Sequence, residues 1–397
     1  MENKAGNPKT IRENNQKVLA QYLFKHGTTS RAKLSNVFQL SSPSVYKNIA
    51  QLIEQNVVLE IGEGGSEGGR RPMLISFNYN MGYIVSMDLK GEYLKLVLAN
   101  LALTIIGRED IRIRDYQNGQ DLFVKTIEII NDLMQKNNIN HSNLLSIVMG
   151  VPGSVNQQTG EVNMPPIWFN VGDLKRIEDL ISKAYPTCKI VIKNDINLAA
   201  IGEMRYGIGK GFKNLIYISV DMGVGAGIII EGKLYEGSRF SSGEIGYSRT
   251  SLQAKKTLED EISIRAITEY IKDHVGINQD GRAQRFLSKD QKTINITEVN
   301  NALANKDEDL LSIMEDVTSK LGLILSNICA LLDIEMIIIG GKIVDFDYNI
   351  KAKLDQILKD YIPIEVKTGF SSLNDDEIIL GGFALSLDEI LKEIAIF

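Results

Sequence analysis

The sequence predicts a mixed α/β protein in which a small helical module with a hairpin precedes a larger unit built from a repeated pattern. Three observations support this: capped, helically spaced apolar residues over 10–53, a glycine-rich hairpin over 57–77, and alternating strands and helices after residue 80. With 397 residues, 44% of them hydrophobic, the chain is long enough for two or three domains. We expect domains at 1–78 and 79–397.

Composition excludes several classes of protein. The sequence has no uncharged apolar run of about 18 residues and no apolar stretch behind its first charges, so we expect a cytoplasmic protein without membrane spans. Cys188 and Cys329 are too few for a cysteine-rich zinc site, and we expect both to be buried as small apolar side chains. The net charge of −6 is unevenly distributed, because residues 1–76 carry ten Lys or Arg against six Glu. A basic module on an acidic body is compatible with nucleic-acid binding.

The first module reads as a helix–turn–helix. A helix is predicted over 10–26, ending at Gly27, and Ser30 is the expected N-cap of a helix over 31–38. The third helix is expected to begin with Ser42 as N-cap and Pro43 in its first turn. The apolar residues expected to be buried by these two shorter helices are Leu34, Val37, Phe38, Val45, Ile49, Leu52 and Ile53.

The opposite face of the third helix is polar. A short helix, a turn and a helix with an exposed polar N-terminal half is an arrangement that enters the DNA major groove. The alternative is a purely structural three-helix cap. The candidate DNA contacts on this helix are Ser42, Ser44, Tyr46, Lys47 and Asn48.

A hairpin follows the third helix. The segments 57–61 and 73–77 read as strands around a tip that contains five glycines and ends in Arg70 and Arg71. Glycines permit close approach of the backbone to DNA, and a guanidinium can reach a phosphate or the minor groove. We expect a DNA-binding wing, with a flexible linker ending in two solvated arginines as the alternative.

Residues 80–397 contain one pattern twice. An apolar strand, an acid, a glycine turn and a second strand occur around Asp88 and again, 133 positions later, around Asp221. This indicates a duplicated α/β lobe with a cleft between the copies. Helices are expected at 120–136, 173–184, 196–206, 258–273, 308–332 and 382–395, and strands at 83–89, 93–100, 145–150, 189–193, 215–220, 226–230 and 335–339.

Several short motifs, taken in order behind the helix–turn–helix, resemble those of the ROK family, which comprises repressors and sugar kinases. They are Gly69-Arg70-Arg71-Pro72, Gly150-Val151-Pro152-Gly153, Asn194-Asp195, Gly223-Val224-Gly225-Ala226-Gly227, Gly243-Glu244-Ile245-Gly246-Tyr247 and Ile339-Gly340-Gly341. The resemblance covers nearly the whole chain and points to the winged-helix repressor branch. It implies a duplicated actin/hexokinase-like (ribonuclease H-like) two-lobe fold, operator DNA and a small sugar such as xylose as partners, and a homodimer or homotetramer.

The resemblance also implies a sugar site. Carried over by position, the residues that would hold sugar hydroxyls are Asn194, Asp195, Glu244, Glu259 and Tyr247, the last in place of the family's histidine. Trp168 is a further candidate, because an indole offers an apolar face to a sugar ring. As alternatives, Asn194 and Asp195 only cap the helix that follows them, and Glu244 lies in a solvated loop.

The family's phosphate loops are altered here. Where its kinases have Asp-x-Gly-Gly-Thr-Lys, this chain has Asp88-Leu89-Lys90-Gly91-Glu92-Tyr93, and where they have Leu-Gly-Thr-Gly it has Val220-Asp221-Met222-Gly223. Hydroxyl and N–H donors are lost and acids are added, so we expect neither ATP binding nor enzyme activity. The family's zinc-binding cysteines are also absent from 248–260, so neither a metal nor a cofactor is expected.

These observations favour a sugar-responsive transcriptional repressor. The alternatives are an active ATP-dependent sugar kinase with an added DNA-binding domain, and a repressor controlled by a protein partner instead of a sugar.

Overall fold

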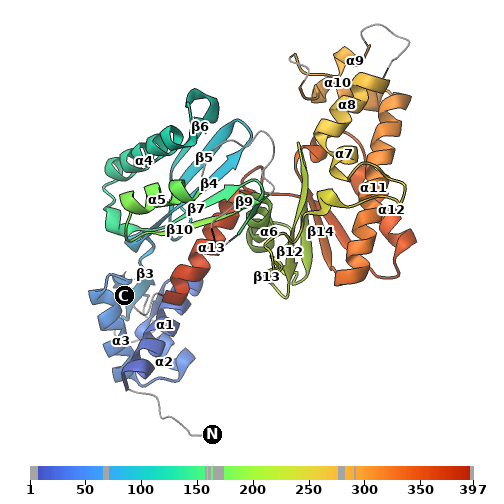
Figure 1. Cartoon of the computed structure of the whole chain (residues 1–397). Coiled ribbons are helices and arrows are strands. Elements are labelled where there is room, and N and C mark those ends of the chain that lie inside the picture. Colours follow the sequence, from blue (N-terminus) through green and yellow to red (C-terminus); the bar gives the residue numbers. More distant parts are fainter. Residues whose placement is uncertain are drawn as a thin grey trace.

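The computed structural model describes residues 8–65, 71–156, 159, 162–163, 174–275, 282–289 and 292–393. Two α/β lobes lie side by side, and the N-terminal module lies below the first of them (Figure 1). Helix α13 (Glu377–Glu393), near the end of the chain, runs from between the lobes down to this module (Figure 1).

The N-terminal module contains three helices and a small antiparallel sheet. The helices are α1 (Pro8–His26), α2 (Arg31–Phe38) and α3 (Ser42–Glu54), and the strands are β1 (Thr29–Ser30), β2 (Val58–Glu63) and β3 (Met73–Phe77) in the order β1-β3-β2. Leu19 and Leu23 of α1, Ile49 and Leu52 of α3, and Ile75 of β3 are fully buried in one core. The arrangement is a helix–turn–helix followed by a wing.

The caps of this module confirm one expectation and correct another. Ser30 caps α2, because its hydroxyl accepts a hydrogen bond from the Lys33 N–H at 3.3 Å. The expected cap Ser42 is wrong: Ser41 is the N-cap of α3 and accepts from the Ser44 N–H at 3.4 Å. Both serines precede Pro43 closely enough for either to satisfy the sequence pattern. The expected burial of Val37 is also wrong, since it is 47% exposed, and Phe38 and Ile53 are only half-buried.

The two lobes contain sheets of the same topology, which confirms the duplication. In the first sheet the order is β10-β7-β4-β5-β6, from β4 (Tyr83–Lys90), β5 (Tyr93–Asn100), β6 (Ile105–Arg112), β7 (Leu144–Val151) and β10 (Lys189–Asn194). In the second it is β13-β12-β11-β14-β15, from β11 (Leu215–Val220), β12 (Val224–Ile230), β13 (Lys233–Leu234), β14 (Met336–Gly340) and β15 (Lys367–Phe370). The first strand of each lobe pairs antiparallel with the next strand and parallel with β7 or β14.

Helices cover the outer faces of both sheets (Figure 1). Helices α4 (Gly119–Lys136) and α5 (Leu174–Ala184) belong to the first lobe, which also has a two-stranded ribbon of β8 (Ser154–Val155) and β9 (Val162–Asn163). The second lobe has α7 (Glu259–Ile262), α8 (Ile264–His274), α9 (Arg282–Arg285), α10 (Ile296–Ala304), α11 (Glu308–Leu332) and α12 (Ile350–Tyr361). Short 3-10 turns lie at Tyr79–Met81, Ile113–Asp115, His141–Asn143, Ile245–Tyr247 and Lys342–Asp345.

Three details of this part differ from expectation. The single helix expected over 258–273 is divided at Ser263, whose extended backbone ends α7 and whose hydroxyl caps α8 by accepting from the Ala266 N–H at 3.1 Å. Helices α9, α10 and α12 and strands β6, β8, β9, β13 and β15 were not expected. Helix α13 begins at Glu377, five residues before the expected start at 382.

Helices α6 (Asp195–Tyr206) and α13 lie between the sheets and cross with their backbones in contact. A Cβ atom on Gly381 of α13 would lie 1.8 Å from the carbonyl oxygen of Leu198, and one on Gly202 of α6 would lie 2.1 Å from that of Glu377. Glycine is therefore required at both positions, and the two helices cannot slide past each other without repacking.

The far end of α13 packs on the N-terminal module. Phe383, Leu387 and Ile390 of α13 belong to the same buried core as Leu19 of α1. The side-chain amide of Gln21 donates a hydrogen bond to the Leu391 carbonyl at 2.9 Å. One helix thus contacts α6 near one end and the winged module near the other.

Among the described residues, no helix is both long and apolar enough to cross a membrane. Both cysteines are free; Cys329 is buried as expected, whereas Cys188 is only half-buried.

We predict that Gly381→Ala lowers the free energy of unfolding by about 1–3 kcal/mol, although alanine is ordinarily the better helix former. The added methyl group has only the backbone of α6 to displace. Chemical denaturation measures the change. Gly107→Ala is the matched control, because its new methyl group would meet only the movable side-chain end of Leu133. Equal stability of Gly381→Ala and the wild type would contradict the crossing described above.

Candidate functional site

Asn194 lies where β10 of the first lobe runs into α6. Its side-chain oxygen accepts from the Asn197 N–H at 2.9 Å, and it is thus the N-cap of α6. Its amide nitrogen donates to the Gly153 carbonyl at 3.1 Å and to Asp195 Oδ1 at 3.2 Å. Asn194 therefore anchors the start of α6 and fixes the carboxylate beside it.

Asp195 is the first residue of α6 and is half-buried. Its Oδ1 accepts from the Ile196 N–H at 2.8 Å. Burial is the main reason that the pKa of Asp195 is raised to about 6; the Lys90 ammonium opposes this shift and the Asp221 carboxylate contributes to it. A carboxylate that is costly to keep charged gains from hydrogen-bond donors supplied by a ligand.

Glu244 reaches the same region from the second lobe. The preceding Gly243 has a φ of +91°, and a Cβ there would lie 1.9 Å from the Ala226 carbonyl oxygen, so the loop follows β12 closely. Burial raises the pKa of Glu244 to about 6, assisted by the charges of Asp195 and Glu259. The carboxylates of the two lobes therefore interact across the space between them.

The remaining expected sugar residues, Glu259, Tyr247 and Trp168, differ in their surroundings. Glu259 Oε2 accepts from the Val224 N–H at 3.0 Å, and Oε1 lies 3.5 Å from Arg265 Nη2, so both oxygens already have partners. Tyr247 is 60% exposed. Trp168 lies outside the described residues. The structure thus brings Asn194, Asp195, Glu244 and Glu259 together and leaves Tyr247 in solvent.

Two ion pairs that the sequence analysis did not anticipate connect the lobes. Lys90 at the end of β4 lies 3.4 Å from Asp221, which follows β11, and Lys193 on β10 lies 2.8 Å from Glu236, which follows β13. Burial disfavours the Lys90 charge, but the carboxylates of Asp221 and Asp88 outweigh it and raise the Lys90 pKa. These two ion pairs connect the first lobe, near Asp195, with the second lobe.

The altered phosphate loops therefore form an ion pair rather than a purely acidic surface. Asp221 is neutralised by Lys90, and Glu92 is 63% exposed beside Arg112, at 3.7 Å. The two added acids therefore lie in different surroundings, Asp221 in the ion pair with Lys90 and Glu92 in solvent. Lys90 stands where the family's phosphate loop has a glycine, and this was the signal available in the sequence.

Asp88 lies on β4 of the first lobe, two residues before Lys90. It is only 1% exposed, and its Oδ1 accepts no hydrogen bond from the described residues. Burial raises the pKa of Asp88 to about 7, with the charge of Lys90 opposing this shift.

The second candidate surface is the start of α3. Ser42, Tyr46 and Lys47 are exposed and Ser44 is half-buried. Asn48 is only 4% exposed, and its amide donates to the Ser44 carbonyl at 2.9 Å, so the expectation that it lies on the exposed face is wrong. On the wing, Arg71 is exposed, and Arg70 lies outside the described residues.

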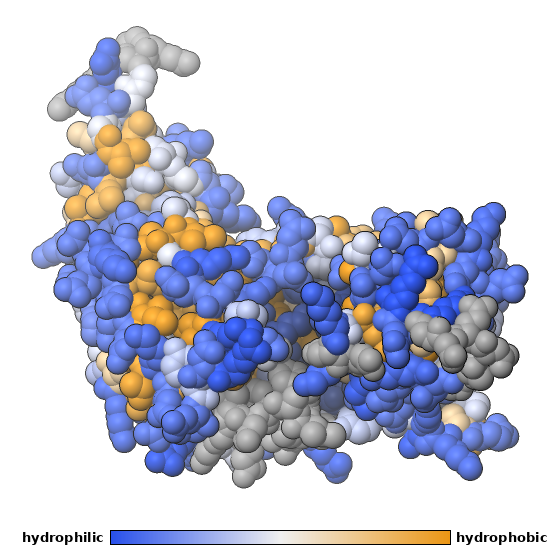
Figure 2. All heavy atoms as spheres, turned by 90° about the horizontal axis from the view of Figure 1, so that it is seen from above, coloured by the Kyte–Doolittle hydropathy of each residue, from blue (hydrophilic) through white to orange (hydrophobic). Residues whose placement is uncertain are grey.

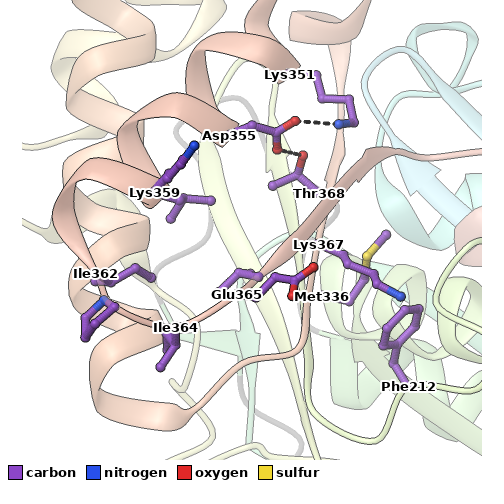
Figure 3. Close-up of a pocket in the computed structure, with 13 residues that line it drawn as sticks. Phe212, Met336, Lys351, Asp355, Lys359, Ile362, Ile364, Glu365, Lys367 and Thr368 are labelled. Atoms are coloured by element: carbon purple, nitrogen blue, oxygen red, sulfur yellow. Dashed lines mark hydrogen bonds and ion pairs between the residues drawn. The ribbon is translucent and has the colours of Figure 1, made fainter.

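A separate hollow of about 780 Å³ lies on the second lobe between α12 and β15 (Figure 3). Some of its side chains contact one another: Asp355 accepts from Lys351 at 2.6 Å and from the Thr368 hydroxyl, and the Lys367 ammonium lies 5.3 Å from the Phe212 ring centre. None of the expected sugar residues lines it.

Hydrophilic side chains predominate over the face seen in Figure 2, and hydrophobic ones gather mainly over one half of it. In the described part of the chain, no three His, Cys, Asp or Glu side chains are arranged to hold a metal ion.

A duplicated α/β domain with acids between its lobes and a winged helix packed on its last helix defines a class of proteins that join a sugar-kinase-like domain to a DNA-binding module. Residues 84–389 match the ROK family, and the chain belongs to this family.

Several relatives are similar over most of the chain. A xylose repressor of Caldicellulosiruptor bescii is 28% identical, with 98% of each chain covered, and one of Staphylococcus xylosus is 30% identical, with 73% of this chain and 72% of the repressor covered. A glucokinase of Halalkalibacterium halodurans is 25% identical over 76% of this chain and 93% of its own. A solved ROK family transcriptional regulator, described as a homologue of the E. coli MLC protein, shares the fold, with a TM-score of 0.78, 23% identity, and 97% of this chain and 98% of its own covered.

We predict that Asp88→Asn raises the free energy of unfolding at neutral and alkaline pH. A carboxyl whose pKa rises from 3.8 to about 7 on folding costs stability once the pH exceeds its unfolded pKa, and by linkage the full cost is about 4 kcal/mol near pH 8. The advantage of the variant should disappear below about pH 4, where the carboxyl is protonated in both states.

Denaturant unfolding across this pH range measures the effect, with the exposed Asp110→Asn on β6 as control. A pH-independent difference between Asp88→Asn and the wild type would show that Asp88 is not held in its costly charged form.

Proposed function

We propose that this protein is a transcriptional repressor that binds operator DNA through its winged helix and releases it when a small sugar, with xylose as the first candidate, binds between the lobes. The similarity to xylose repressors over nearly the full chain supports this proposal. The observation that carries it is structural: α6, which begins at Asp195, crosses α13, which packs on the winged module. Such a repressor acts where the chromosome is, in the cytoplasm.

In this proposal the sugar hydroxyls donate to Asp195 and Glu244. These carboxylates come from opposite lobes and are both costly to keep charged without donors. Asn194 holds Asp195 in place through a hydrogen bond. Glu259 accepts hydrogen bonds from the sugar only when its carboxylate gives up its contact with the Val224 N–H or with Arg265. Tyr247 and Trp168 remain proposed contacts to the sugar ring.

The proposed DNA contacts are Ser42, Ser44, Tyr46 and Lys47 at the start of α3, together with Arg70 and Arg71 of the wing. The first four would lie in the major groove, and the arginines would contact phosphates or the minor groove. We infer a homodimer, since paired winged helices bind two half-sites about one helical turn apart.

The sugar acts on DNA binding through linkage. A ligand shifts an equilibrium only by its differential affinity for the two states, and contacts from both lobes are completed only at one separation of the lobes. A change in that separation displaces α6, and the backbone contact at Gly202 and Gly381 carries the displacement to α13. The winged modules of the dimer then lose the spacing that the operator requires.

We infer that the protein is not a sugar kinase. Lys90 and Asp221 lie on the two loops that correspond to the family's phosphate loops. Their side chains form an ion pair between the lobes, so the charges of these loops compensate each other and are not free for a nucleotide. The glucokinase relative covers 76% of this chain, whereas the xylose repressor of Caldicellulosiruptor bescii covers 98% of it.

We predict that Asp195→Asn and Glu244→Gln each weaken xylose binding tenfold or more while operator binding without sugar stays nearly unchanged. Each substitution removes a charged acceptor of hydroxyl hydrogen bonds, worth about 1.5–3 kcal/mol per bond. Calorimetry measures sugar affinity, and gel retardation measures the sugar needed to release DNA.

The matched control is Glu365→Gln, an exposed acid on the second lobe outside the cleft. Wild-type affinity for xylose should also fall as the pH drops through about 6, because protonated Asp195 and Glu244 no longer accept two hydroxyl donors. Release of operator by the variants at the wild-type xylose concentration would place the sugar elsewhere.

We also predict no ATP-dependent phosphorylation of xylose, glucose or their amino derivatives in the presence of magnesium. A coupled assay for ADP release tests this prediction. Sustained turnover with one sugar, abolished by Asp195→Asn, would establish the kinase alternative.

A further inference from the structure

Arg31, the first residue of α2, contacts both elements that the proposed function places on DNA. Its Nη2 lies 2.6 Å from Glu60 Oε1 on wing strand β2. Its guanidinium carbon lies 5.2 Å from the centre of the Tyr46 ring on α3. One side chain therefore connects α2, α3 and the wing.

We propose that Arg31 is a positioning residue for DNA recognition. It fixes the Tyr46 ring and strand β2 in a single arrangement, and thereby affects which DNA sequence is preferred rather than the electrostatic attraction to phosphates. This proposal rests on the proposed function, in which the winged helix binds operator DNA.

The apolar core holds neither the Tyr46 ring nor most of strand β2, so contacts with polar side chains such as Arg31 fix their positions. The Tyr46 side chain is 64% exposed, so the apolar core of the module leaves most of its ring in solvent. A guanidinium stacked on the ring restricts it through a cation–π contact. On β2, only Val58 is buried, and the pairing with β3 is irregular between Glu60 and Gly62. The Arg31–Glu60 pair acts next to this irregularity.

The charge of Arg31 is already compensated. Its side chain is 20% exposed, and the guanidinium is paired with Glu60, whereas a phosphate contact needs a cation that releases counterions from DNA. An arginine is suited to a positioning role because its planar fork binds a carboxylate while its face stacks on a ring, which a lysine cannot do.

The two roles of Arg31 differ in their consequences for Glu60. If Arg31 positions Tyr46 and β2, loss of the Glu60 charge frees the guanidinium and should impair recognition. If Arg31 instead contacts phosphate, the same loss removes a competing anion and should strengthen DNA binding. Glu63, an exposed acid on the same strand, provides the control for charge removal alone.

The experiment compares Arg31→Met, Arg31→Lys, Glu60→Gln and Glu63→Gln with the wild-type full chain. The probe is a duplex that the wild-type protein selects from a library with a randomised core, together with its single-base variants. Affinity is measured for each duplex over a range of salt concentrations, and thermal melting shows that each variant is folded.

We expect Arg31→Met, Arg31→Lys and Glu60→Gln to reduce discrimination about fivefold or more at the base pairs that Tyr46 faces, with an unchanged salt slope. Glu63→Gln should leave discrimination unchanged. The proposal is overturned if Arg31→Met lowers the salt slope by about one with discrimination intact, or if Glu60→Gln only tightens binding as Glu63→Gln does. If the wild type selects no duplex, the proposed function itself fails, which is a different result.

Discussion

The backbone contact between α6 and α13 is the constraint on which the rest of the molecule depends. Gly202 and Gly381 bring the two helices so close that a single methyl group at either position would meet a carbonyl oxygen. Because packed elements move between discrete arrangements rather than deforming continuously, a shift of α6 must move α13 as well. Helix α6 begins at the acids of the cleft, and α13 ends in the core of the winged module. The crossing therefore connects the region where we propose that the sugar binds, between the lobes, with the proposed DNA-binding surface through two helices in direct contact.

Charge determines what the cleft can respond to. Asp88, Asp195 and Glu244 all carry raised pKa values because they are withdrawn from water, whereas Lys90 and Lys193 pair with acids of the opposite lobe. The separation of the lobes is thus held by ion pairs within the protein, and in the proposed function Asp195 and Glu244 accept further hydrogen bonds from the hydroxyls of a sugar. In the proposed function, the Lys90–Asp221 ion pair lies where a sugar kinase would bind its nucleotide, so the domain binds a sugar without phosphorylating it.

The sequence predicted the features that local patterns encode and missed those that depend on distant contacts. The repeated strand, acid and glycine turn predicted the duplicated sheets, and the Asn-Asp pair predicted the start of α6. Asn48 was misplaced although the signal was present: it lies three residues after Val45 and four before Leu52, on the buried face. Strand β6 was missed because an edge strand exposes charged residues and resembles a loop. Lys90 and Asp221 are 131 positions apart in the chain, and their pairing depends on how the two lobes face each other, which no local pattern contains.

We propose that the region between the lobes and the winged module are energetically coupled, and such coupling is reciprocal. The most direct measurement is the affinity for xylose of the free protein and of the protein saturated with its selected operator duplex, both by calorimetry. The coupling predicts that operator weakens xylose binding by the same factor by which xylose weakens operator binding, about 5- to 150-fold for typical coupling energies. Equal xylose affinity with and without operator would show that the sugar and the DNA do not communicate through this protein.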